Sequence, residues 1–133
     1  MAISRYKVVE RGRNSFCAKK PWAVKYEKGK IVKGRNGTGV FVFETLDDAK
    51  RYNEKFCNAG TIIRVLPIGR GFKPKFRPAN FANDTIKRFW ADINITKRGC
   101  RNKLELANIL RIHFMQVEDN DGTIIYPAVR VME

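Results

Sequence analysis

The segment VFVFETLDDAKRYNEKFCNAGTIIRVL, residues 40–66, carries the clearest structural signals in this chain. Val40–Phe43 is a short apolar run typical of a strand. Within Glu44–Phe56 the apolar residues recur at helical spacing, and Thr45 is placed to cap that helix. The β-branched run Thr61–Leu66 then predicts another strand. The segment is therefore expected to form a strand–helix–strand unit.

Further strands are predicted on both sides of this unit. Those before it are Arg5–Val9, Ser15–Lys19, Trp22–Tyr26 and Lys30–Lys33. After it, Leu110–Glu118 and Thr123–Met132 flank a turn at residues 119–122, which indicates a closing β-hairpin. Pro127 suits an edge or a bulge of its last strand, because proline cannot donate to a β-ladder.

The remaining periodic segments predict helices. Asp84 can cap a second helix that continues through Ile93, whereas Lys103–Leu110 fits either a helix or a strand. We therefore expect one α+β domain over residues 1–133. It would hold an antiparallel sheet of about five to seven strands, with two or three helices packed on one face.

The net charge of +14 is the dominant feature of the composition, with 27 Lys and Arg against 13 Asp and Glu. An excess of this size repels itself and is typical of a protein with a polyanionic partner. No apolar run approaches the ~20 residues of a membrane span, so we expect no membrane association.

The stretch from Ala59 to Asn83 contains no acidic residue and places phenylalanine rings among cations. Glycines and prolines are expected to keep much of it in a loop. Cations bind phosphates and ring faces stack on bases, so this pattern indicates a nucleic acid or a nucleotide as the ligand. The predicted phosphate-binding residues are Arg64, Arg70, Lys73, Lys75 and Arg77, and the predicted stacking residues are Phe72 and Phe76.

Two further basic segments are candidates for phosphate contacts. Lys97, Arg98 and Arg101 belong, with Lys103, to a cluster that can extend the phosphate-binding track. Lys33 and Arg35 border the loop GRNGTG, which superficially resembles a phosphate loop. That loop lacks the terminal Gly-Lys-Ser/Thr, and a predicted strand rather than a helix follows it. We therefore expect at most secondary phosphate contacts there.

The sequence gives no pattern typical of a catalytic or metal site. The three cysteines, Cys17, Cys57 and Cys100, are too far apart for zinc-ligand spacing, and His113 is the one histidine. We expect a protein without a metal or other cofactor that is not an enzyme. Scattered cysteines without a signal-peptide pattern are typical of a reducing cytoplasm.

The run Gly39-Val40-Phe41-Val42-Phe43-Glu44-Thr45-Leu46-Asp47-Asp48-Ala49 resembles a strand-to-helix signature of short phage-encoded accessory proteins of unassigned role. This resemblance implies a small protein made during infection and located in the host cytoplasm. It also implies an anti-defence role, exerted by occupying a host enzyme or by sequestering a nucleotide signal. No site residue follows from it.

Two interpretations of function remain. In the first, the chain is a non-enzymatic binding protein for a phosphate-rich ligand, either a nucleic acid or a nucleotide signal. In the second, it is an inhibitor whose basic surface covers an acidic or nucleic-acid-binding surface of a host protein. Self-association into a homo-oligomer is compatible with both.

Overall fold

A computed structural model of the chain describes residues 3–10, 24–34, 38–57, 60–79, 82–118 and 121–132. It confirms the α+β class, with a six-stranded antiparallel sheet, a two-stranded sheet and four α-helices in the described residues. The predicted strand Ser15–Lys19, the start of Trp22–Tyr26 and the candidate residue Arg35 lie outside the described residues.

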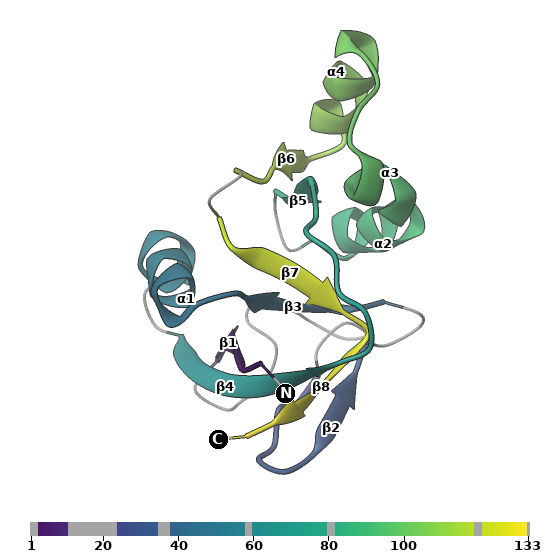
Figure 1. The fold of residues 1–133 in the computed structure, drawn as a ribbon. Helices are drawn as coiled ribbons and strands as arrows, with labels where there is room; N and C mark the ends of the chain where they lie inside the picture. The colour runs from purple at the N-terminus through teal and green to yellow at the C-terminus, as the bar shows by residue number, and fades with distance from the viewer. Residues whose placement is uncertain are drawn as a thin grey trace. The chain divides into compact units, whose positions relative to one another are not determined.

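The chain forms two compact units, Met1–Phe72 with Gly122–Glu133, and Lys73–Asp121. The first unit contains β1 (Arg5–Val9), β2 (Ile31–Lys33), β3 (Val40–Phe43), α1 (Leu46–Tyr52), a π-helical turn (Asn53–Cys57), β4 (Thr61–Ile68), β7 (Thr123–Tyr126) and β8 (Ala128–Val131) (Figure 1). The second unit contains β5 (Phe76–Pro78), α2 (Asn83–Ala91), α3 (Ile93–Arg98), α4 (Lys103–Arg111) and β6 (Phe114–Gln116).

The sheet of the first unit has the strand order β2-β8-β4-β1-β3-β7. Only Pro127 separates β7 from β8. At one end of the strand order β7 pairs with β3, and near the other end β8 pairs with β4 and β2, so the chain bends at Pro127. The sheet therefore curls around a core to which every strand contributes. Val42, Val65, Val129 and Val131 are fully buried there, and each contributes roughly 1.5–3 kcal/mol through burial.

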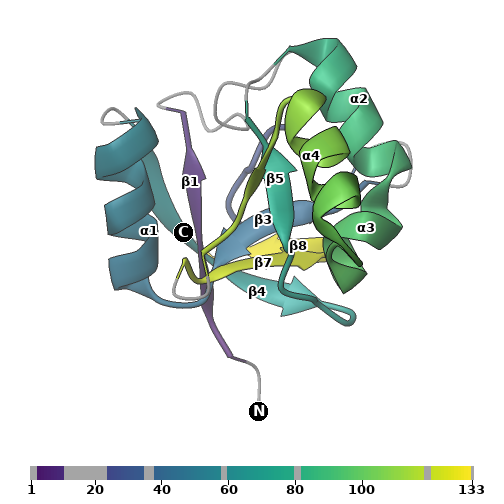
Figure 2. The ribbon, with the colours of Figure 1, turned by 90° about the horizontal axis from the view of Figure 1, so that it is seen from above.

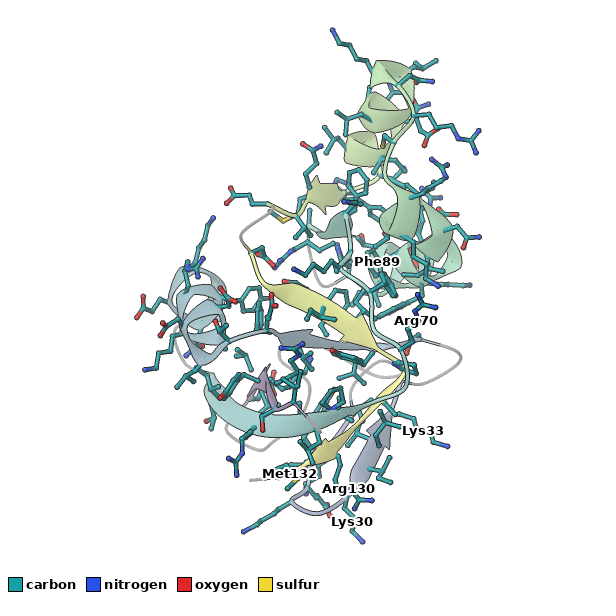
Figure 3. The ribbon with its side chains drawn as sticks, viewed as in Figure 1. Lys30, Lys33, Arg70, Phe89, Arg130 and Met132 are labelled. Carbon is teal, nitrogen blue, oxygen red and sulfur yellow. The ribbon has the colours of Figure 1, made fainter. Side chains whose placement is uncertain are left out.

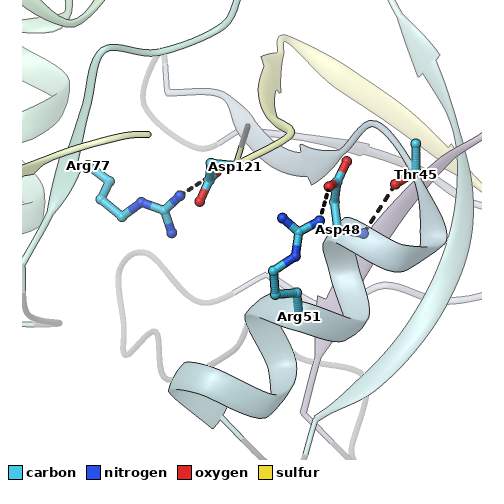
Figure 4. A network of polar contacts seen from close by, with 5 residues as sticks. All are labelled: Thr45, Asp48, Arg51, Arg77 and Asp121. Carbon is cyan, nitrogen blue, oxygen red and sulfur yellow. Dashed lines mark hydrogen bonds and ion pairs between the residues drawn. The ribbon is translucent and has the colours of Figure 1, made fainter. Parts of the chain in front are cut away.

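The predicted strand–helix–strand segment forms β3, α1 and β4, with β1 lying between the two strands in the sheet. The Thr45 hydroxyl accepts a hydrogen bond from the Asp48 backbone amide at 3.1 Å, as the capping prediction requires (Figure 4). Val8, Phe43 and Ala49 form a second cluster, in which α1 packs on β1 and β3.

The second unit has a small core of its own, in which α2 and α3 pack on β5 and α4 packs on β6 (Figure 2). Its centre is Phe89, whose ring lies 5.0 Å from that of Trp90 and 5.6 Å from that of Phe114, both in edge-to-face geometry. Among the described residues, α1 therefore packs on the six-stranded sheet and α2, α3 and α4 pack on the two-stranded sheet, whereas one shared sheet face was predicted.

The predicted C-terminal hairpin is wrong. Phe114–Gln116 pairs with β5, and the strands after the turn pair with β3, β4 and β2. Leu110 and Arg111 belong to α4, because Asn102 caps a helix across the segment that was ambiguous in the sequence. The cap of α2 was also predicted wrongly: Ala82 is the N-cap, and Asp84 lies inside the first turn.

His113 follows α4 with a φ of 64°, the left-handed conformation that glycine adopts at many helix ends. Its Cβ opposes this conformation, so His113→Gly should raise the free energy of unfolding by about 0.5–1 kcal/mol. Urea denaturation checks this, with His113→Ala as the matched control because alanine keeps the Cβ and should give no comparable gain. A glycine variant no more stable than the alanine variant would contradict the prediction.

Candidate functional site

A pocket of about 680 Å³ lies within the second unit and is the candidate functional site. We call it the cationic pocket. Four short segments line it: Lys75–Phe76, the α3–α4 connection Gly99–Asn102, the start of α4 with Lys103 and Leu106, and Gln116–Glu118, where β6 ends. This size is in the range of pockets that hold nucleotides and other small ligands.

Backbone hydrogen bonds fix the position of Lys75 at this pocket. Its amide donates to the Thr96 carbonyl of α3 at 2.7 Å, and its carbonyl accepts from the Val117 amide at 2.9 Å. Lys75 is therefore held between the end of α3 and the chain that leaves β6, while its side chain is exposed.

The α3–α4 connection is held equally firmly. Gly99 ends α3 with a φ of 81°, and its amide donates to the Ile95 carbonyl at 2.8 Å. The Asn102 side chain then caps α4 by accepting from the Glu105 amide at 2.9 Å. A preorganised connection of this kind presents Arg101 and Lys103 at little entropic cost.

Arg98 joins the two helices through its guanidinium, which donates to the Glu105 carboxylate and to the Gly99 carbonyl, each at 2.7 Å. The hydrogen bond from Arg98, supported by Arg101, holds the pKa of the Glu105 carboxyl below its usual value. Because the folded-state pKa is lowered, this contribution to stability is present above the ordinary glutamate pKa and is lost as the pH falls through the lowered value.

Charge in the cationic pocket is mostly positive. The charged residues that line it are Lys75, Arg101, Lys103 and one carboxylate, Glu118. Neither lysine forms an ion pair in the part of the chain that the structure describes. The pocket can therefore offer its two ammonium groups to an anion without first breaking an internal salt bridge.

Apolar side chains and a thiol complete the lining. Leu106 and Val117 offer apolar surface, and Phe76, which is 2% exposed, contributes very little accessible surface. Burial, followed by the Glu105 carboxylate, raises the pKa of the Cys100 thiol, while Arg98 acts in the opposite direction. The thiol is therefore largely protonated at neutral pH and a poor nucleophile.

Two predicted site residues have structural positions instead. Phe76 belongs to the core of the second unit, so its face is not available to a base, and the stacking prediction for it is wrong. Arg77 is buried and pairs with the Asp121 carboxylate at 2.6 Å, so it is not an exposed phosphate ligand (Figure 4). The sequence-based prediction included the charge of Arg77 but could not include its partner Asp121, which lies 44 positions later.

The other predicted residues are distributed over both units. Lys73, Lys97 and Arg101 are exposed in the second unit, and of these Arg101 lines the cationic pocket. Arg64 on β4 and Arg70 after it are exposed in the first unit, as is Lys33 at the end of β2. Phe72, also in the first unit, is half-buried and exchanges two backbone hydrogen bonds with Ile125 of β7.

Asn102 and Gln116 were not assigned to the site from the sequence. A recognisable signal existed for Asn102, because an asparagine followed three residues later by Glu105 is a helix-start pattern. It would have placed Lys103, already a member of the predicted basic cluster, at the first position of α4. Gln116 has no such signal, because it reaches the pocket through the pairing of β6 with β5.

Comparison of this chain with protein-family models, curated proteins and solved structures found no match. Among the described residues, none of the helices combines the length and the hydrophobicity needed to cross a bilayer.

Proposed function

We propose that this protein binds a phosphate-bearing ligand of nucleotide size in the cationic pocket and does not transform it. The observation that carries the proposal is the convergence of Lys75, Arg101 and Lys103 on one pocket of about 680 Å³. Charge-assisted hydrogen bonds from such groups to phosphate oxygens contribute about 1.5–3 kcal/mol each.

The lining of the cationic pocket offers a charged environment and an apolar one, which suit different parts of a nucleotide. Cations from the two sides of the pocket would hold the phosphates, and Leu106 and Val117 would contact a sugar or a base. A pocket of this volume with this division fits a nucleotide or a dinucleotide.

Binding without turnover is part of the proposal. Lysine and arginine supply charge, the amides of Asn102 and Gln116 supply hydrogen bonds, and the protonated Cys100 thiol is a weak nucleophile. A protein with this lining would act by withholding its ligand, which is one of the modes that the phage-protein resemblance implies.

Native mass spectrometry of the protein as purified from cells tests this proposal. We expect a population whose mass exceeds that of the chain by one nucleotide or dinucleotide. We also expect the protein to take up ATP or a cyclic dinucleotide when either is added. A bare protein mass that stays bare with both probes would contradict the proposal. It would favour the alternative of an inhibitor that covers an acidic surface of a host protein.

A further inference from the structure

In the first unit, the six-stranded sheet has an outer face that points away from the core. This outer sheet face carries a pattern of cationic and apolar residues. Along β2, β8 and β4, Val32, Val129 and Val65 point into the core. Successive residues of a strand point to opposite faces, so the intervening residues share the outer face. They are Ile31 and Lys33 on β2, Ala128 and Arg130 on β8, and Arg64, Leu66 and Ile68 on β4.

The strand register places three cations of this outer sheet face on one diagonal. Ile31 pairs with Arg130, which pairs with Leu66 on its other side. Lys33 lies two residues beyond Ile31, and Arg64 lies two residues before Leu66. Lys33, Arg130 and Arg64 are therefore successive diagonal neighbours across three strands, with Cα atoms roughly 7–8 Å apart at each step.

The diagonal is exposed and apolar side chains border it. Ile31 is 48% exposed and Ile68 is 38% exposed. Arg130 donates to the Gly29 carbonyl at a long 3.4 Å, a contact it can give up at little cost. No acidic residue occupies the outer-face positions of β2, β8 and β4 named above. Figure 3 labels Lys33 and Arg130 on β2 and β8, and Lys30 just before β2.

We propose that the outer sheet face binds the backbone of a single-stranded nucleic acid. A regular row of cations on a rigid sheet matches a polymer with a regular row of phosphates, and Ile31 and Ile68 can contact sugars and bases beside it. The net charge of +14 favours the same partner. This proposal is independent of the ligand in the cationic pocket.

A linear anion fits this surface better than the other anionic partners do. A membrane surface requires a continuous apolar face for insertion, and here the diagonal of cations separates Ile31 from Ile68. An acidic protein surface has no regular charge spacing that would match the strand register. Binding to a membrane or to an acidic protein is therefore not proposed, and the experiment below tests for both.

The test measures the salt dependence of binding to a fluorescein-labelled 15-nucleotide oligo(dT). Each phosphate contact on a single strand adds about 0.7 to the negative slope of log K against log salt concentration. The double variant Lys33→Gln/Arg130→Gln should therefore lower the magnitude of the slope by about 1.4. The matched control is Lys50→Gln/Lys87→Gln, which removes two exposed cations on α1 and α2 and should leave the slope unchanged.

Each remaining outcome decides the proposal. Equal loss in both double variants would show unspecific attraction by net charge and would overturn it. Equal affinity for poly-glutamate or for vesicles of phosphatidylglycerol would also overturn it, because the occupant would then be another class of partner. A Lys75→Gln/Lys103→Gln variant that keeps the slope would support it, and would separate this surface from the cationic pocket.

Discussion

Replacing Lys75 and Lys103 together by glutamine will weaken the binding of ATP or of a cyclic dinucleotide by about 100-fold or more. Both lysines line the cationic pocket, and they come from different elements, Lys75 from just before β5 and Lys103 from the start of α4. Losing two charge-assisted hydrogen bonds of about 1.5–3 kcal/mol each corresponds to at least two decades in the dissociation constant. Isothermal titration calorimetry at fixed salt measures the change.

Two controls separate this effect from a general loss of charge. The Lys50→Gln/Lys87→Gln variant removes the same charge from exposed helix positions and should bind within a few-fold of the unaltered protein. The Lys75→Arg/Lys103→Arg variant keeps the charge and should retain most of the affinity. If Lys75→Gln/Lys103→Gln and Lys50→Gln/Lys87→Gln weaken ligand binding equally, the proposal of a specific phosphate site in the cationic pocket is contradicted.

Replacing Phe89 by alanine will lower the free energy of unfolding of the second unit by about 3–5 kcal/mol. The Phe89 side chain is fully buried and contacts the rings of Trp90 and Phe114 in edge-to-face geometry. Deleting it leaves a cavity between α2 and β6, in a unit whose other large buried apolar side chains, among the described residues, are Phe76, Ile86, Ile109 and Phe114. The substitution therefore also loosens the strand whose end, Gln116–Glu118, lines the pocket.

Hydrogen exchange of the α2 and β6 amides measures this local stability without assuming that both units unfold together. The matched control is Phe89→Leu, which keeps most of the volume and should cost about 1 kcal/mol. A Phe89→Ala variant whose amides in these two elements keep their protection would contradict the central place of this ring in the core.

The elements predicted correctly are those whose signals are local. Thr45 and the spacing that follows it define α1, and the apolar runs around α1 define β3 and β4. The six-stranded sheet falls within the predicted range for the same reason. The C-terminal hairpin failed because the pairing of Phe114 with the strand before α2 is non-local, and the sequence carries no signal for it.

The sequence predicted some residues of the candidate site and missed others. The acid-free loop contributes Lys75 to the cationic pocket, and the second basic cluster contributes Arg101 and Lys103. The stacking prediction for Phe76 failed because the burial of its ring depends on tertiary packing. The phosphate-binding prediction for Arg77 failed because its ion pair is formed with the distant Asp121. Neither effect can be inferred from the number of charges and rings in a segment. The diagonal of Lys33, Arg130 and Arg64 was not predicted for a related reason. It depends on the register of three strands that are far apart in the sequence.

The most direct measurement is an amide NMR titration of the ¹⁵N-labelled protein with ATP and with a cyclic dinucleotide. We predict saturable chemical-shift changes at Lys75, across Gly99–Lys103 and at Gln116–Glu118, the segments that line the cationic pocket. The same titration of the Lys75→Gln/Lys103→Gln variant should leave these resonances nearly unmoved. Shift changes confined to other residues, or none with either probe, would contradict the assignment of this pocket as a phosphate-ligand site.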